Sequence, residues 1–280
     1  MFGVIGGTGF YRLTELKDVT PKEVETPFGK PSAPLLIGQI SGKKVAFLAR
    51  HGASHDLLPS EVNYRANIWA LKSIGVTKIL GVSATGSLVD KIRPGEFAIP
   101  SQYFDFTKGR RFSTFFGEGL IAHISSAKPV CENLSKELYL LANKMDSPCH
   151  ENVTYGCVEG PRLGTRAESF FLKNAGCHLV GMTNVPEAFL AREAQVCYAT
   201  LAIATDYDCW KDDPNDHVSS DKVMALYKST LNSVKTLVLK CIEESAFEEC
   251  SCRESLKFSL ISREESLTPE KKELLRVLKA

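Results

Sequence analysis

The order of strand-like and helix-like stretches constrains the fold of this chain more than any other feature of its sequence. Short apolar stretches alternate with longer amphipathic ones along most of its length. The strand-like stretches are 2–5, 33–40, 43–49, 77–84, 96–100, 178–182 and 197–205, and the helix-like ones are 59–75, 133–145, 185–195 and about 221–244. Such alternation predicts an α/β fold in which helices cover a mostly parallel sheet.

Two local signals refine this expectation. The stretches 33–40 and 43–49 are separated only by Ser41 and Gly42, which predicts a hairpin. In the stretch 59–75, Ser60 is expected to cap the start of a helix and Gly75 suits the position just after its end.

The domain organisation follows from the length and from one change of composition. A chain of 280 residues suits one large α/β domain, and no repeat, low-complexity segment or clear linker divides it. After Phe247 the sequence becomes strongly charged. We expect residues 1–247 to form the domain and residues 248–280 to be a charged extension, part of the domain or peripheral to it. Within the extension, Thr268 as an N-cap and Pro269 at the first helical position predict a helix.

The overall charge excludes two classes of partner. The chain carries 34 Lys plus Arg against 33 Asp plus Glu, a formal net charge of +1. So balanced a surface argues against binding to nucleic acid or to anionic membranes. No apolar run reaches the roughly 18 residues of a membrane-spanning helix. The start has no basic region and leads straight into a strand, so we expect no secretory signal and a cytoplasmic protein, with the nucleus as the alternative.

The nine cysteines do not form a disulfide pattern typical of small secreted domains. Several lie in apolar runs, and we expect most of them to be buried as small hydrophobic side chains. Cys250 and Cys252 are the one close pair, and they could bind a metal ion or form a strained disulfide. Because neither a second cysteine pair nor a histidine stands near them in the sequence, we expect no metal site.

The first strand-like stretch ends in a glycine-rich loop, "GVIGGTGF", at residues 3–10. Glycines let a backbone approach a phosphate closely, and Thr8 could donate a hydroxyl to it. The dinucleotide-binding pattern G-x-G-x-x-G is not matched, because Arg12 stands where its third glycine belongs. A tight turn without any ligand is the alternative.

Polar residues follow several other predicted strands. Arg50 and His51 come after the stretch 43–49, Ser83 to Ser87 end the next one, and Met182 and Thr183 end a later one. Guanidinium groups, hydroxyls and exposed backbone N–H groups are what a phosphate requires. At the carboxyl ends of neighbouring strands they would converge on one site. Each group alone is equally compatible with ordinary surface residues.

The stretch "ATDYDCW" places Asp206 and Asp208 directly after a buried strand. If the extended backbone continues, both carboxylates point the same way. Such a pair could act as acid and base, accept hydrogen bonds from a purine or, with the aspartates at 212, 213 and 216, bind a metal. The spacing fits no calcium loop, so we expect no metal here either.

Taken together, these motifs resemble those of the 5′-methylthioadenosine phosphorylases, the trimeric branch of the purine nucleoside phosphorylases. The matching motifs are "GVIGGTG", "TPFGKPS", "LARHG", "VNYRANIWALK", "EGPR…TRAESF", "MTNVPEAFLAREA" and "ATDYDCW", and the likeness runs from about Phe2 to Leu239. The resemblance implies a single α/β domain with a mixed central sheet partly closed as a barrel, assembled as a homotrimer. It implies phosphorolysis of 5′-methylthioadenosine to adenine and 5-methylthioribose 1-phosphate in purine and methionine salvage. Inorganic phosphate is then a co-substrate, and no cofactor or metal is expected.

The resemblance also assigns roles to individual residues. The implied phosphate site comprises Thr8, Arg50, His51, Ser83, Ala84 and Thr183. The implied nucleoside site comprises Met182 under the ribose, Asp206 at purine N7 and Asp208 at the 6-amino group, together with Thr85, Gly86 and Leu163. Asp206 and Asp208 are the expected catalytic residues. Gly164, Ser220, Val223, Met224 and His123 are expected to set specificity, His123 from a neighbouring subunit.

Several of these positions depart from the family pattern. Leu163 replaces a phenylalanine that stacks on the base, and Thr85 replaces a cysteine. Ser220 stands where an apolar residue usually lines the 5′ pocket, which suggests a more polar pocket that also accepts adenosine. Two alternative functions stay open: phosphorolysis of 6-oxopurine nucleosides or methylthioinosine, and non-catalytic nucleoside binding.

Overall fold

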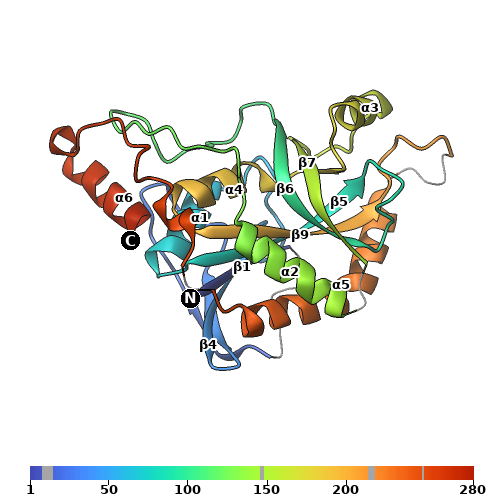
Figure 1. The fold of residues 1–280 in the computed structure, drawn as a ribbon, viewed down its shortest axis with the longest axis horizontal. Helices are drawn as coiled ribbons and strands as arrows, with labels where there is room; N and C mark the ends of the chain where they lie inside the picture. The colour runs from blue at the N-terminus through green and yellow to red at the C-terminus, as the bar shows by residue number, and fades with distance from the viewer. Residues whose placement is uncertain (8–14, 146–147, 214–217, 248) are drawn as a thin grey trace.

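The computed structural model describes residues 1–7, 15–145, 148–213, 218–247 and 249–280 (Figure 1). Within these residues a single nine-stranded sheet runs through the molecule. Its strands are β1 (Phe2–Gly6), β2 (Lys17–Lys22), β3 (Leu35–Ile40), β4 (Lys43–Ala49), β5 (Lys78–Ser87), β6 (Phe97–Phe106), β7 (Cys149–Val158), β8 (Leu179–Gly181) and β9 (Cys197–Asp206). The hairpin expected around Ser41 and Gly42 is confirmed, since β3 and β4 pair antiparallel on either side of them.

Part of the sheet closes on itself. The strand order is β2-β3-β4-β1-β5-β8-β7-β6-β9, and β9 pairs again with β5, so that the last five strands in this order form a ring. In the ring, β5 and β9, β6 and β7, and β7 and β8 run parallel, whereas β5 and β8, and β6 and β9, run antiparallel. The implied mixed sheet, partly closed as a barrel, is confirmed.

Helices cover the sheet on two sides. They are α1 (Tyr64–Ser73), α2 (Glu132–Lys144), α3 (Arg166–Asn174), α4 (Asn184–Glu193), α5 (Ser220–Glu244) and α6 (Pro269–Lys279), with short 3₁₀ turns at Ser251–Glu254 and Glu264–Ser266. α2 and α5 share one apolar cluster with β9, and α1, α4 and α6 contribute to a second. Leu134, Leu138 and Leu141 of α2 are buried at helical spacing. None of the described helices is both long and apolar enough to span a bilayer.

The clearest predicted helix starts later than expected. The prediction that Ser60 caps it is wrong, because α1 begins at Tyr64 and the Asn63 side chain accepts a hydrogen bond from the Ala66 amide at 3.2 Å. Gly75 does follow the C-cap with a φ of +86°, a left-handed conformation that suits glycine.

Three elements, β2, β7 and α3, were not predicted from the sequence. β2 is exposed along its whole length, and Val153 is the one buried residue in the first half of β7, so neither shows a run of apolar residues. α3 carries a readable start, since Thr165 and Glu168 form a capping box.

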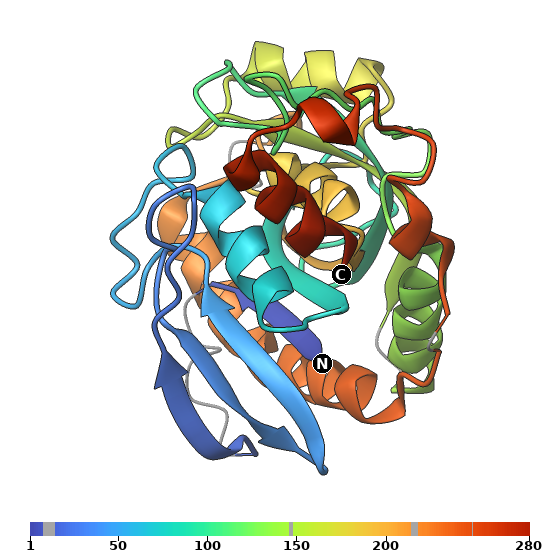
Figure 2. The same ribbon diagram turned by 90° about the vertical axis from the view of Figure 1, so that its left-hand side faces the viewer.

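The C-terminal extension packs onto the domain. Thr268 caps α6 and Pro269 opens it, as expected. Leu274, Leu275 and Leu278 are buried in the cluster that contains residues of α1 and α4, and Figure 2 shows α6 lying across α1. The boundary at residue 247 stays a prediction.

Candidate active site

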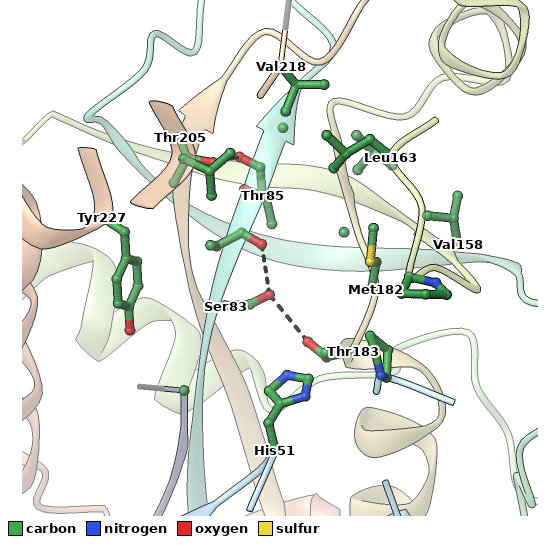
Figure 3. A pocket seen from close by; sticks show the side chains of 18 of the residues that line it. His51, Ser83, Thr85, Val158, Leu163, Met182, Thr183, Thr205, Val218 and Tyr227 are labelled. Carbon is green, nitrogen blue, oxygen red and sulfur yellow. Dashed lines mark hydrogen bonds between the residues drawn. The ribbon is translucent and has the colours of Figure 1, made fainter. Parts of the chain in front are cut away.

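A cavity of about 470 Å³ opens where the carboxyl ends of β4, β5 and β9 meet the end of β8 (Figure 3). Most of the predicted site residues line it: Arg50, His51, Ser83, Ala84, Thr85, Gly86, Leu163, Gly164, Met182, Thr183, Asp206, Asp208, Val223 and Met224. The structure therefore brings together side chains that lie more than 150 positions apart in the sequence.

Three of the predicted residues are not among those lining the cavity. Thr8 lies outside the described residues, although the preceding Gly7 lines the cavity. Ser220 is exposed at the start of α5, and Val218 lines the cavity in its stead. His123 lies beside the C-terminal extension, where its backbone N–H donates to the Ser259 carbonyl oxygen at 2.8 Å.

Arg50 forms a buried ion pair beneath the cavity. Its Nε and Nη2 each donate to a carboxylate oxygen of Glu187 at 2.7 Å, and Tyr198 donates to the same carboxylate at 2.7 Å. Further bonds run from Nη1 to the Val82 carbonyl and from Nη2 to the Ile5 carbonyl. Since a guanidinium has five N–H groups, these bonds leave one Nη1–H for a ligand. The Nε–H and one Nη2–H, which together could bind a phosphate in a bidentate manner, donate to Glu187 instead.

His51 is a neutral side chain in this site. Burial, followed by the charge of Arg50, lowers its pKa to about 4. Nδ1 lies 2.9 Å from the Leu57 carbonyl oxygen, and because a carbonyl only accepts, the proton is on Nδ1. Near neutral pH, the remaining ring nitrogen, Nε2, is therefore a hydrogen-bond acceptor.

Two hydroxyls meet at the middle of β5. Ser83 Oγ lies 3.4 Å from Thr183 Oγ1 and 3.3 Å from the Tyr155 hydroxyl, and the first contact is drawn in Figure 3. Thr183 precedes α4, but its side chain makes no capping bond. β8 runs antiparallel to β5, with Gly86 opposite Val180, and this direction carries Thr183 back to Ser83. The two residues are neighbours for this reason and not because two parallel strands end together.

Asp206 has a proton affinity well above that of an ordinary carboxyl group. Burial raises its pKa to about 6, even though it accepts hydrogen bonds from Thr205 Oγ1 and from the Asp208 amide, each at 2.7 Å. An aspartate that holds a proton near neutral pH can donate it to a substrate atom.

A β-bulge and a glycine set the positions of the two aspartates. The pairing of β5 with β9 shifts between Thr85 and Gly86, so that Gly86 faces Asp206. Asp208 has a φ of 53°, in the left-handed region that aspartate tolerates. A Cβ at Gly86 would lie 3.0 Å from Asp206 Oδ1 and 3.2 Å from Asp208 Cβ, which is too close for a rigid neighbour. Gly86 therefore acts by leaving room for both carboxylates.

Much of the remaining lining of the cavity is apolar. It comprises Val158, Leu163, Val180, Met182, Val218, Val223 and Met224. A cavity with an apolar wall and a few convergent polar groups is typical of a site for a small organic molecule.

Glu187, the partner of Arg50, is a residue that the sequence reasoning missed. It lies in the motif "MTNVPEAFLAREA", and its acidic side chain stands in an otherwise apolar stretch. A buried carboxylate requires a partner, and this rule was the available signal for the ion pair with Arg50.

The comparisons with known proteins agree with this geometry. A sequence model described as the phosphorylase superfamily matches residues 1–243. An S-methyl-5′-thioadenosine phosphorylase of Geobacter sulfurreducens is 44% identical over 279 residues, which cover 99% of this chain and 97% of that protein. The chain belongs to the S-methyl-5′-thioadenosine phosphorylase family. The match confirms the resemblance on which the predicted site residues rest.

Solved structures of this family share the fold. A methylthioadenosine phosphorylase from an Antarctic soil metagenomic library has a TM-score of 0.93 and 40% identity, covering 99% of this chain and 98% of the other. A variant of the adenosine/methylthioadenosine phosphorylase of Schistosoma mansoni, in complex with methylthioadenosine, has a TM-score of 0.81 and 39% identity over 86% of this chain and 90% of the other.

Proposed function

We propose that this chain catalyses the phosphorolysis of 5′-methylthioadenosine to adenine and 5-methylthioribose 1-phosphate, a pentosyl transfer that serves purine and methionine salvage. The observation that carries the proposal is the single cavity that holds the Ser83–Thr183 hydroxyls, His51 and the Arg50 Nη1–H together with Asp206 and Asp208. Phosphate and purine, the two groups that exchange places on the ribose, then have separate polar partners in one cavity.

In the proposed mechanism, phosphate attacks the anomeric carbon as the glycosidic bond breaks. A phosphate oxygen forms the new bond to C1′, and the electron pair of the C1′–N9 bond leaves with adenine. Asp206 donates its proton, or a strong hydrogen bond, to purine N7 and so stabilises the departing base. The raised pKa of Asp206 suits this role, because it keeps part of the carboxyl protonated near neutral pH.

The phosphate end works mainly through neutral groups. The hydroxyls of Ser83 and Thr183 donate to phosphate oxygens, and Thr8 is proposed to do so as well. Because His51 presents a lone pair on Nε2, it accepts the one hydrogen of HPO₄²⁻. The ion pair with Glu187 keeps Arg50 in position, and Arg50 contributes its remaining Nη1–H.

Asp208 is proposed to select adenine over 6-oxopurines. Its carboxylate accepts a hydrogen bond from the 6-amino group. A 6-oxo group would place two acceptors face to face, at a cost of about 1–3 kcal/mol or more. We therefore propose that inosine and methylthioinosine are poor substrates.

The 5′ pocket is proposed to be apolar. Ser220 suggested a polar pocket, but the cavity near α5 is lined by Val218, Val223 and Met224, and Ser220 is not among the lining residues. An apolar wall favours a methylthio group over a hydroxyl. We therefore propose methylthioadenosine as the preferred substrate and adenosine as a weaker one.

The proposed assembly is a homotrimer in which the segment around His123 completes the cavity of a neighbouring chain. The Ile261 amide donates to the Ile121 carbonyl at 2.9 Å, so the segment around His123 lies beside the C-terminal extension. Ile121 is 47% exposed and Ile261 is 62% exposed, as apolar side chains that contact another chain would be in a single subunit. Light scattering of the purified chain tests this assembly, and a monomer would contradict it.

The decisive experiment measures adenine release from methylthioadenosine with and without phosphate. Release that requires phosphate and yields a pentose 1-phosphate is expected. Release without phosphate would indicate hydrolysis, and no release with methylthioadenosine, adenosine, inosine or methylthioinosine would leave only binding. The ratios of kcat/KM among these nucleosides test the roles given to Asp208 and the 5′ pocket. The reaction as proposed takes place in the cytoplasm and uses neither an organic cofactor nor a catalytic metal.

A further inference from the structure

A cluster of four cysteines lies away from the cavity. Cys131, Cys197, Cys250 and Cys252 have Sγ atoms that all lie within 4.8 Å of one another. The one pair with a defined distance, Cys131 and Cys250, is separated by 3.6 Å. Four thiolates around a tetrahedral zinc ion, each at about 2.3 Å, would lie about 3.8 Å apart. The cluster thus has the size of a tetrathiolate metal site.

The four sulfurs come from three parts of the chain. Cys131 precedes the first turn of α2, Cys197 opens β9, and Cys250 and Cys252 lie on the C-terminal extension. A second pair is absent near Cys250 and Cys252 in the sequence, but Cys131 and Cys197 lie near them in space. The fold supplies one across sequence separations that no local motif reveals.

We propose that these four cysteines bind one structural Zn²⁺ ion that fastens the C-terminal extension to the domain. Binding converts four thiols to thiolates and releases four protons, and the resulting Zn(Cys)₄ centre carries a charge of −2. Four thiolate ligands in tetrahedral positions are the donor set that zinc prefers in structural sites. Because each sulfur lies near the three others, the arrangement favours one shared ion over two separate disulfides.

The surroundings of the cluster suit a negative centre. The Leu134 amide, in the first turn of α2, donates to Cys131 Sγ at 3.4 Å. Backbone N–H groups at a helix start stabilise a thiolate. Arg253 is adjacent to Cys252 in the chain, and Arg192 interacts electrostatically with Cys252. The charge of Arg192 and a backbone donor therefore lie near the proposed site.

The proposed ion has no part in the reaction. Cys197 and Asp206 are the two ends of β9, a separation of about 30 Å for an extended strand of this length. Four protein ligands also leave no open coordination position, as is usual for structural zinc. The site instead holds the extension, whose following residues include Ile261 and α6.

The test is the metal content of the full chain, purified without chelator and with reductant present. We expect about one zinc per chain by mass spectrometry of the metals. Refolding with Co²⁺ should give the intense visible and near-ultraviolet absorption of a tetrahedral cobalt tetrathiolate. The Cys250→Ser/Cys252→Ser variant should lose both signals, and it should unfold at a lower temperature than the parent chain.

The matched control is Cys149→Ser, which changes a half-buried cysteine outside the cluster and should keep its zinc. Two outcomes would overturn the proposal. One is less than a tenth of a zinc per chain, with the four cysteines free or joined in disulfides that mass spectrometry detects. The other is iron in place of zinc. Because the readout is metal content, it does not depend on the proposed function.

Discussion

Asp206 is buried and His51 is partly buried in the lining of the cavity, yet burial has opposite consequences for their pKa values. It raises the pKa of the Asp206 carboxyl to about 6 and lowers that of the His51 imidazole to about 4. In each case the neutral form is favoured, because a poorly hydrated site penalises charge. The carboxyl group thereby becomes a proton donor, and the imidazole becomes an acceptor.

Asp206→Asn should lower kcat by about 10²- to 10⁴-fold, the usual contribution of a general acid. In the parent enzyme kcat/KM should fall as the pH rises through about 6, since the acid form is then lost. In the variant, kcat/KM should not show this fall near pH 6. Phosphate itself also titrates with pH, and comparing the pH profiles of parent and variant separates its effect from that of Asp206. Identical profiles would show that Asp206 is not the acid.

The same substitution should stabilise the folded chain at alkaline pH. The pKa of Asp206 lies above its ordinary value of 3.8. The buried charge therefore does not lower the free energy of unfolding below pH 4, and its destabilising effect grows as the pH rises to about 6. Removing that charge should add up to about 3 kcal/mol at pH 8 and almost nothing at pH 4. Urea unfolding at the two pH values measures this difference.

Thr183→Val keeps the shape of the side chain and removes the hydroxyl that lies 3.4 Å from Ser83 Oγ. We expect the KM for phosphate to rise about tenfold, equivalent to one hydrogen bond to a charged group. The KM for methylthioadenosine should change less than twofold. In the control Thr236→Val, which removes an exposed hydroxyl, the KM values for phosphate and for methylthioadenosine should both change less than twofold. If the nucleoside KM rises instead, Thr183 has been assigned to the wrong substrate.

Among the elements, the ion pair of Arg50 and Glu187 joins the end of β4 to α4, and Tyr198 links it to β9. Such a pair does little for stability while it is intact, but breaking it leaves a buried charge. Glu187→Ala should therefore destabilise the chain by about 3–5 kcal/mol, measured by urea unfolding.

The control for this prediction is the double variant Arg50→Met/Glu187→Leu. It removes both charges and fills the space with apolar side chains, so it should recover most of the lost stability. It should not recover activity, because Arg50 also lines the cavity. Equal destabilisation of the single and double variants would mean that packing, and not the charge, is what matters there.

Elements with a strong apolar periodicity could be predicted from the sequence, and those with a weaker one could not. β5, β9, α2 and α5 follow long buried patterns and lie where they were expected. β2 is exposed throughout and has no such pattern. The closed ring and the antiparallel direction of β8 came only with the family resemblance or the structure, because strand pairing depends on contacts far apart in the sequence.

The candidate site was predictable in a similar, partial way. Its residue types were readable at the ends of the strands, and the resemblance gave their roles. The partner of Arg50, the proton position on His51 and the exposure of Ser220 each depend on three-dimensional neighbours. None of these neighbours is adjacent in the sequence, so no local pattern could reveal them.

For the molecule as a whole, the extension is predicted to be part of the domain's core. Leu278 is fully buried against the cluster of α1 and α4. Leu278→Ala should cost about 2–5 kcal/mol, which lowers Tm by several degrees in a chain of this size. The exposed neighbour Lys279→Ala is the control. An unchanged Tm in the Leu278 variant would make the extension peripheral.

The phosphate end of the cavity has consequences for how the enzyme responds to its medium. The charge of Arg50 is balanced by Glu187, and His51 is uncharged. At the proposed phosphate site we therefore expect the anion to be held by directed hydrogen bonds and hardly by net electrostatic attraction. Added salt weakens attraction between separated charges and leaves short hydrogen bonds almost untouched. Sulfate has the same shape but no proton to offer the imidazole, so we expect it to bind the proposed phosphate site more weakly than phosphate does.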